Sequence, residues 1–159
     1  MSLESSLAHC ASLQVVSRLD ALTDVITWFD QLSLDSIDPY LRIEAQTALI
    51  EGFTNVVQHA HADLPSSTPI EMRVQIDKPL FQIMIWDQGP SYDFAGAMHQ
   101  LSTAADPELN PLNRERHWGQ VLFLRLVNER GWRFVYDRLP DQRNCLLMEK
   151  ALILSDIAF

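Results

Sequence analysis

Hydrophobic residues near the start of the chain recur at the three- and four-residue steps of an amphipathic helix. The stripe consists of Leu19, Leu22, Ile26 and Phe29, with Val25 and Leu32 beside it. This spacing predicts a helix over about residues 19–32. A short apolar run at residues 13–16 comes just before it and predicts a strand.

A second helix is predicted from Asp38 to about Ala60. Asp38 is a good N-cap residue, and Pro39 suits the first helical position because it has no backbone N–H to leave unpaired. Residues spaced along one helical face are expected to point into the core: Ile43, Ile50, Phe53 and Val57. Pro65 and the Ser/Thr-rich residues that follow it break this pattern.

The middle of the chain predicts a β-hairpin. Apolar and polar residues alternate with period two over residues 71–76, as in a half-buried strand. Residues 81–86 are almost continuously apolar, which indicates a more buried strand with Trp86 in the core. The sequence Asp-Lys-Pro at residues 77–79 supplies the turn between them.

The rest of the chain predicts a loop, a helix and a second hairpin. Residues 88–116 contain Gly and several Pro, with one short helix expected at about residues 93–101. Helical spacing returns over residues 121–127, and strands are predicted at 132–136 and 145–149. Helices and strands segregated in this order indicate an α+β fold, a two-layer α/β sandwich.

The chain length of 159 residues, 47% of them apolar, fits a single domain with one core. We expect this domain to span residues 1–159, with a core over about residues 10–150. Residues 151–159 form an apolar tail. Packing on the domain and contribution to a dimer contact both remain open for this tail.

The charge balance limits the partners. Twelve basic and 21 acidic residues give a formal net charge of −9, which disfavours binding to a nucleic-acid backbone or an anionic membrane. Small molecules and proteins are the favoured partners. Cys10 and Cys145 are expected to be ordinary thiols, and no apolar run approaches the roughly 20 residues of a membrane span. A soluble cytoplasmic protein is therefore expected.

The first candidate for chemistry is a polar ridge on the second helix. Glu51, Asn55 and His59 follow one another at four-residue steps, beside the predicted buried face. A carboxylate suits a general base, and an Asn side-chain oxygen suits Mg²⁺. A solvated helix face is the alternative. His59 and His61 do not share a helical face, so they are not expected to form a metal site.

Two further features carry candidate chemistry. Asp87, at a strand end before Gly89, is placed to accept a hydrogen bond from an exocyclic amine, and the glycine lets a ligand ring approach closely. A plain strand-ending turn is the alternative. Gly119 at the start of a helix leaves backbone N–H groups for an anion, with Arg114 and Arg116 nearby as either anion ligands or solvated charges.

Taken together, the three features resemble the motifs of the GHKL (Bergerat) ATPase superfamily, in particular its anti-sigma factor serine/threonine kinase branch. The sequence EGFTNVVQHA at residues 51–60 looks like the N box. DQGPSYD at residues 87–93 looks like the G1 box without its second Gly, and WGQVLFL at residues 118–124 looks like the G2 box. The resemblance covers about residues 10–150.

The resemblance implies a fold and roles for individual residues. The implied fold is a two-layer sandwich with a mixed, mostly antiparallel sheet covered on one face by helices. Glu51 would be the general base, and Asn55 would ligate the Mg²⁺ that bridges the ATP phosphates. Asp87 would bind the adenine amino group, and Gly89 would give the ring room.

The implied phosphate site involves the G2 box and a lid at about residues 102–118. Gly119 and the N–H groups after it, with Arg116, His117 and Gln120, would contact the phosphates. His117 and Gln120 depart from the family pattern, which has Gly and Leu at these positions. These departures affect lid closure and turnover more than adenine binding.

The function implied by the resemblance is an ATP- and Mg²⁺-dependent protein serine/threonine kinase that acts as an anti-sigma factor. It would phosphorylate a small STAS-type antagonist protein, sequester a sigma factor and, as the family often does, form a homodimer. The alternative is a partner-switching module of the same fold with little or no turnover, suggested by His117 and Gln120. A sensor histidine kinase domain is a third, weaker interpretation because no dimerisation helix pair is visible.

Overall fold

The computed structural model describes residues 9–103, 114–153 and 156–157, and for residues 114–119 only the backbone. Its elements follow the predicted order. The strands are β1 (His9–Val16), β2 (Pro69–Asp77), β3 (Leu80–Asp87), β4 (Trp132–Arg138) and β5 (Asn144–Ala151). The helices are η1 (Leu19–Ala21), α1 (Leu22–Asp30), α2 (Pro39–Asn55), η2 (Val56–Ala60), α3 (Phe94–Thr103) and α4 (Arg114–Arg130).

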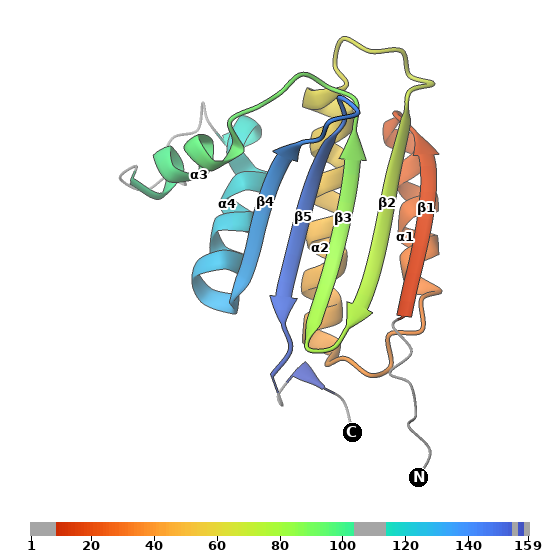
Figure 1. Cartoon of the computed structure of the whole chain (residues 1–159), viewed down its shortest axis with the longest axis vertical. Helices are drawn as coiled ribbons and strands as arrows, with labels where there is room; N and C mark the ends of the chain where they lie inside the picture. The colour runs from red at the N-terminus through yellow and green to blue at the C-terminus, as the bar shows by residue number, and fades with distance from the viewer. Residues whose placement is uncertain (1–8, 104–113, 154–155, 158–159) are drawn as a thin grey trace.

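The five strands form one sheet in the order β1-β2-β3-β5-β4 (Figure 1). All four pairings between these described strands are antiparallel, in agreement with a mostly antiparallel sheet. The register of β3 on β5 sets Asp87 opposite Asn144. The register of β4 on β5 brings Arg138 to the same end of the sheet. One end of the sheet therefore collects polar side chains from three strands.

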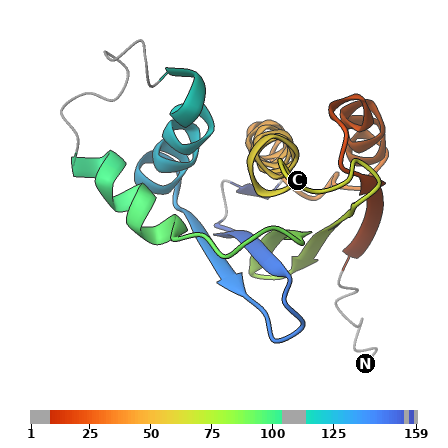
Figure 2. The same cartoon turned by 90° about the horizontal axis from the view of Figure 1, so that it is seen from above.

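The described helices lie on one face of the sheet, so the fold has two layers, as predicted (Figure 2). Helix α2 runs over the middle strands, α1 lies beside β1, and α4 lies over β4 with α3 next to it (Figures 1 and 2). The largest fully buried side chains between the layers include Phe29, Phe53, Phe81, Phe123 and Met148. No described helix has the length and apolar composition needed to cross a membrane.

The start of α2 is confirmed, but the predicted buried face of this helix is partly wrong. The Asp38 carboxylate accepts hydrogen bonds from the N–H groups of Tyr40 and Leu41. Ile43, however, is 62% exposed. The residues buried along α2 are Leu41, Ala45, Ala48, Leu49, Gly52 and Phe53.

Small side chains explain this difference. A Cβ on Gly52 would lie 2.6 Å from Cδ1 of Ile85 on β3. The helix therefore approaches the sheet along its Ala and Gly positions, which buries more of the neighbouring large side chains. Hydrophobicity alone predicted that the isoleucines of α2 would be buried. The close approach of the helix to the sheet instead places the small residues at the buried face.

The expectation of a core position for Trp86 is also wrong. Strand β3 alternates: Phe81, Ile83 and Ile85 are buried under the helices, while Trp86 is half-buried on the opposite face. The guanidinium groups of Arg73 and Arg143 lie 5.3 and 5.9 Å from its ring centroids. A nearly continuous apolar run thus conceals a two-sided strand, one face of which is covered by arginine side chains.

The described part of the C-terminal tail packs on the domain. Ile157 forms a β-bridge with Ile37, and the N–H of Asp38 donates to the carbonyl of Asp156. The Asp156 carboxylate pairs with the ammonium group of Lys150 at 3.3 Å, and both side chains are 8% exposed. These contacts attach the tail to the end of the sheet and to the start of α2.

Candidate functional site

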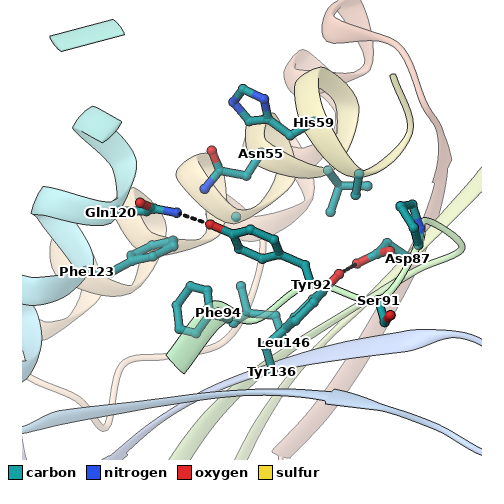
Figure 3. Close-up of a pocket in the computed structure, with 14 residues that line it drawn as sticks. Asn55, His59, Asp87, Ser91, Tyr92, Phe94, Gln120, Phe123, Tyr136 and Leu146 are labelled. Carbon is teal, nitrogen blue, oxygen red and sulfur yellow. Dashed lines mark hydrogen bonds between the residues drawn. The ribbon is translucent and has the colours of Figure 1, made fainter. Parts of the chain in front are cut away.

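A cavity of about 480 Å³ opens between the helical layer and the sheet, where β3 ends (Figure 3). It lies among η2 and the end of α2, the loop after β3, α3, α4, β4 and β5. The lining residues are Gly52, Asn55, Val56, His59, Ala60, Asp87, Pro90, Ser91, Tyr92, Phe94, Gln120, Phe123, Tyr136 and Leu146. Two predicted motifs, those around Asn55 and Asp87, thus meet at one cavity together with Gln120 of the third.

Asp87 is the buried polar group of the cavity, with 1% exposure. Its Oδ1 accepts hydrogen bonds from the N–H of Gly89 and from Nδ2 of Asn144, both at 2.8 Å. Its Oδ2 accepts a hydrogen bond from the hydroxyl of Tyr136 at 2.7 Å. A buried carboxylate held by three donors has a fixed orientation, which suits a group that recognises a ligand.

Asn144 and Tyr136 were not predicted as site residues from the sequence. Both reach Asp87 through the long-range register of β3 on β5 and of β4 on β5. The only local signal was that Asn144, a polar residue, comes just before the strand predicted at residues 145–149. Asn144 is fully buried and also donates to the carbonyl of Gly89 at 3.0 Å. It therefore joins Asp87 to the turn that follows β3.

Tyr136 remains a hydrogen-bond donor. Burial, together with the hydrogen bond to Asp87 and its negative charge, raises the pKa of the Tyr136 hydroxyl well above its usual value. The ring of Tyr136 packs edge-on against Tyr92 at 6.5 Å and at a tilt against Phe94 at 6.1 Å. These contacts hold the hydroxyl at the floor of the cavity.

Gly89 was expected to lie beside the ligand ring and give it room, but the structure places it elsewhere. It is not among the residues that line the cavity. A Cβ on Gly89 would lie only 2.4 Å from the carbonyl oxygen of Ala60, at the end of η2. The glycine therefore lets the loop after β3 pass against the end of the helix, and its carbonyl accepts a hydrogen bond from Arg138 at 2.8 Å.

His61 connects the same two segments. It is 3% exposed, and its Nε2 accepts a hydrogen bond from the N–H of Gln88 at 2.8 Å. Burial lowers its pKa, an effect that the charge of Asp87 opposes. The N–H of His61 also bonds to the carbonyl of Val56, five residues back, so the helix ends in a wide π-type turn. In the sequence, His61 was considered only as a metal ligand, and its hydrogen bond with the N–H of Gln88 was not predicted.

Glu51 and Asn55 lie one turn apart near the end of α2, and both are half-buried. Asn55 lines the cavity, whereas Glu51 is outside its lining. Burial raises the pKa of the Glu51 carboxyl. Among the described residues, no group of three or more His, Cys, Asp or Glu side chains is arranged to hold a metal ion. A metal here would depend on Asn55 and on ligands from outside the chain.

Tyr92 spans the cavity from the loop after β3 to α4 (Figure 3). Its hydroxyl accepts a hydrogen bond from Nε2 of Gln120 at 3.0 Å. Phe94 and Phe123 pack beside it, with their ring centroids 6.4 Å apart. Gln120, which departs from the family pattern, thus links the loop to the helix across the opening between them.

The expected position of Gly119 at a helix start is wrong. Helix α4 begins at Arg114, so Gly119 is its sixth residue. Residues 114–118 contain neither Gly nor Pro, and the helix begins before the glycine. Amides in a helix interior are engaged within the helix, so they are not free for an anion in this conformation. The side chains of Arg116 and His117, and lid residues 104–113, lie outside the described structure.

Comparison with known sequences finds a family match. Residues 15–150 match the family described as histidine kinase-like ATPase domain. A search of curated proteins finds no match. The matched region includes Asn55, Asp87 and Gly119.

Comparison with solved structures supports the same fold. A chain in the crystal structure of the SiaB–SiaC complex from Pseudomonas aeruginosa is similar, with a TM-score of 0.56 and 9% sequence identity. The similarity covers 89% of this chain and 89% of that chain. At this identity the likeness concerns the fold, and it extends over nearly the whole domain.

Proposed function

Because the chain belongs to the histidine kinase-like ATPase family, we propose that it binds ATP with Mg²⁺ in the cavity beside Asp87 and phosphorylates a serine or threonine of a partner protein. The observation that carries this proposal is the buried, fixed carboxylate of Asp87 at the floor of a cavity that Asn55 also lines. One cavity thus offers an acceptor for a base and an oxygen ligand for a metal.

The residues around Asp87 fit a purine base. A carboxylate oxygen has two lone pairs, and Oδ2 accepts only one hydrogen bond among the described residues, from Tyr136. One acceptor position therefore stays available for an exocyclic amine. Phe94, Phe123 and Tyr92 give the cavity aromatic walls that suit a flat ring.

Asn55 fits a magnesium site that is completed by phosphate and water. Mg²⁺ prefers oxygen ligands and in phosphate sites takes only one or two from the protein. When bound, Mg-ATP supplies the transferable phosphoryl group and a metal charge that stabilises it. Asn55 would orient the metal, and Gln120, Arg116 and His117 would contact the phosphate end, whereas the amide of Gly119 is engaged within α4.

Glu51 is proposed as the general base that takes the proton from the attacking hydroxyl. A carboxyl with a raised pKa holds that proton better than an ordinary Glu does. Because Glu51 is outside the cavity lining, a hydroxyl that it deprotonates would approach from the Glu51 side of α2. This arrangement favours a protein substrate, whose side chain reaches in from the surface.

The partners proposed are a small STAS-type antagonist, which would carry the phosphorylated side chain, and a sigma factor, which the chain would sequester. A net charge of −9 supports protein partners over nucleic acid. The fold similarity to a chain from the SiaB–SiaC complex supports a domain that works in a protein complex. A homodimer and a cytoplasmic location belong to the same proposal.

The test is transfer of label from γ-labelled ATP to antagonist proteins encoded in the same genome, with Mg²⁺ present. Wild type is expected to transfer label, and Glu51→Gln is expected to abolish transfer while still binding ATP. Glu129→Gln, at an exposed position near the end of α4, is the matched control and should transfer like wild type. Lack of transfer to every antagonist would overturn the kinase proposal.

A second candidate function is a partner-switching module that binds ATP with little turnover. It is favoured by the position of Glu51 outside the cavity lining and by the Tyr92–Gln120 hydrogen bond across the cavity. A fluorescent ATP analogue distinguishes the two: binding without transfer supports this module, and binding with transfer supports the kinase. No binding at millimolar Mg-ATP argues for a module that does not use nucleotide.

A further inference from the structure

The hydroxyl of Tyr136 and Oδ2 of Asp87 form a pair of polar atoms 2.7 Å apart in the cavity, whose lining also includes the aromatic rings of Tyr92, Phe94 and Phe123. Both side chains line the cavity and point toward each other from adjacent regions of the sheet (Figure 3). Because they come from β4 and β3, with β5 between those strands, the sheet fixes their separation. Any flat ligand that reaches Asp87 also meets Tyr136.

Counting donors and acceptors defines what this pair can recognise. Oδ1 of Asp87 accepts from Gly89 and Asn144, which uses both of its lone pairs. Oδ2 accepts from Tyr136 and keeps one lone pair. The Tyr136 oxygen has one hydrogen, which can rotate about the C–O bond, and it can also accept. The pair can therefore present either two acceptors or one acceptor beside one donor.

Adenine matches the second arrangement. Its 6-amino group is a donor, and the adjacent ring atom N1 is an acceptor. We propose that Tyr136 is a specificity-determining residue that reads N1: its hydroxyl hydrogen turns from Asp87 to N1, while Oδ2 of Asp87 accepts from the 6-amino group. This inference rests on the proposed function, because it assumes that the base lies against Asp87.

The exchange keeps the buried groups satisfied. Without a base, the Tyr136 hydroxyl donates to Oδ2; with a base, the amino group replaces it there and the hydroxyl donates to N1. Each of these donors and acceptors has a hydrogen-bond partner in both states. The exchange therefore avoids the free-energy cost of a buried polar group without a hydrogen bond. A base with a 6-oxo group would instead direct an oxygen at the Asp87 carboxylate, which disfavours guanine.

The packing of Tyr136 supports this role. Tyr92 and Phe94 hold its ring, so the hydroxyl oxygen stays in place while only its hydrogen moves. Burial and the neighbouring Asp87 keep the hydroxyl protonated at neutral pH, which a donor to N1 requires. Tyr92 provides a comparison within the same cavity, because its hydroxyl bonds to Gln120 and not to Asp87.

The test compares the dissociation constants of ATP and of 1-deaza-ATP, in which a C–H replaces N1. Wild type is expected to bind ATP about tenfold more tightly, the size of one hydrogen bond in a buried site. Tyr136→Phe is expected to bind the two nucleotides equally, because only the hydroxyl that reads N1 is gone. Tyr92→Phe is the control, and its ratio of the two constants should stay at the wild-type value.

The outcomes separate this inference from the proposed function. If folded wild type binds ATP and 1-deaza-ATP equally, Tyr136 does not read N1, and this result needs no variant. A Tyr136→Phe protein that keeps the wild-type ratio, or that binds ATP more tightly than wild type, also overturns the inference while ATP binding stands. If wild type binds neither nucleotide, the proposed function fails, and the inference fails with it.

Discussion

Gly89 lies so close to Ala60 that a Cβ added to the glycine would be 2.4 Å from the alanine's carbonyl oxygen. The contact joins the loop after β3 to the end of η2, and backbone atoms cannot move aside as a side chain can. The two motifs that the sequence separates by some thirty residues are therefore held together by direct backbone packing.

Gly89→Ala is expected to destabilise the domain by about 1–3 kcal/mol, the usual cost of overpacking a closely packed region. Urea denaturation measures this loss. Gly52→Ala is the matched control: its nearest neighbour is the end of the Ile85 side chain, which can rotate, and alanine favours the helix. A smaller loss is expected for this control. Equal losses of unfolding free energy in Gly89→Ala and Gly52→Ala would contradict the close contact of Gly89 with the Ala60 carbonyl.

Asn55→Ala is expected to remove the Mg²⁺-dependent part of ATP binding. Loss of a group that only orients a metal ligand typically weakens metal affinity by about ten- to a hundredfold, so loss of the ligand itself is expected to weaken it at least as much. In EDTA the variant and wild type should bind ATP alike; with Mg²⁺ only wild type should bind more tightly. Gln58→Ala, exposed on η2, is the control. An unchanged Mg²⁺ effect in Asn55→Ala would exclude Asn55 as the ligand.

Because of His61, we expect the free energy of unfolding to fall in mild acid. Burial lowers its pKa below the ordinary value of 6.5, so below pH 6.5 the unfolded chain binds more protons than the folded one. The stability that neutral His61 contributes to the folded state is fully present above about pH 6.5. It is lost as the pH falls through the folded-state pKa. One proton gives a slope of at most about 1.4 kcal/mol per pH unit.

Unfolding free energies measured between pH 7.5 and 5.5 test this expectation. His61→Gln should flatten the slope, because the titrating group is gone while the side-chain oxygen can still accept from Gln88. His99→Gln, at an exposed position on α3, should retain the wild-type slope. A His61→Gln protein with the full wild-type slope would show that other groups cause the pH dependence.

Asp156→Asn is expected to destabilise the domain by about 3 kcal/mol, because it leaves the buried ammonium of Lys150 without its nearer carboxylate. Glu44 lies 3.9 Å from the same ammonium and cannot fully replace it. Thermal and urea unfolding measure the effect. Asp141→Asn breaks an exposed pair with Arg143 and should leave the midpoints unchanged. A small effect of Asp156→Asn would mean that the tail is not anchored by this pair.

Local signals in the sequence predicted the elements well. The N-cap at Asp38, the hairpin of β2 and β3 and the short helix α3 depend on neighbouring residues, and the structure confirms them. The cavity position of Asp87 followed from a strand that ends in a Gly turn. These features need no knowledge of long-range pairing.

Features that depend on long-range packing were missed. Tyr136 and Asn144 meet Asp87 only through the register of three strands, which no local pattern encodes. The buried face of α2 follows its small residues because the sheet approaches there, and Ile43 is left outside. Helix α4 starts at Arg114 because helix propensity upstream of Gly119 outweighs the break suggested by one glycine.

The central claim is that ATP binds against Asp87. Its most direct test is a calorimetric titration of Mg-ATP into wild type, Asp87→Asn and, as a matched control, Asp93→Asn at the exposed start of α3, with folding checked by circular dichroism. We predict saturable binding by wild type and Asp93→Asn, and affinity at least tenfold weaker in Asp87→Asn, the effect of losing one charged hydrogen bond. Folded wild type that shows no binding at millimolar Mg-ATP, or Asp87→Asn that binds like wild type, would contradict the account.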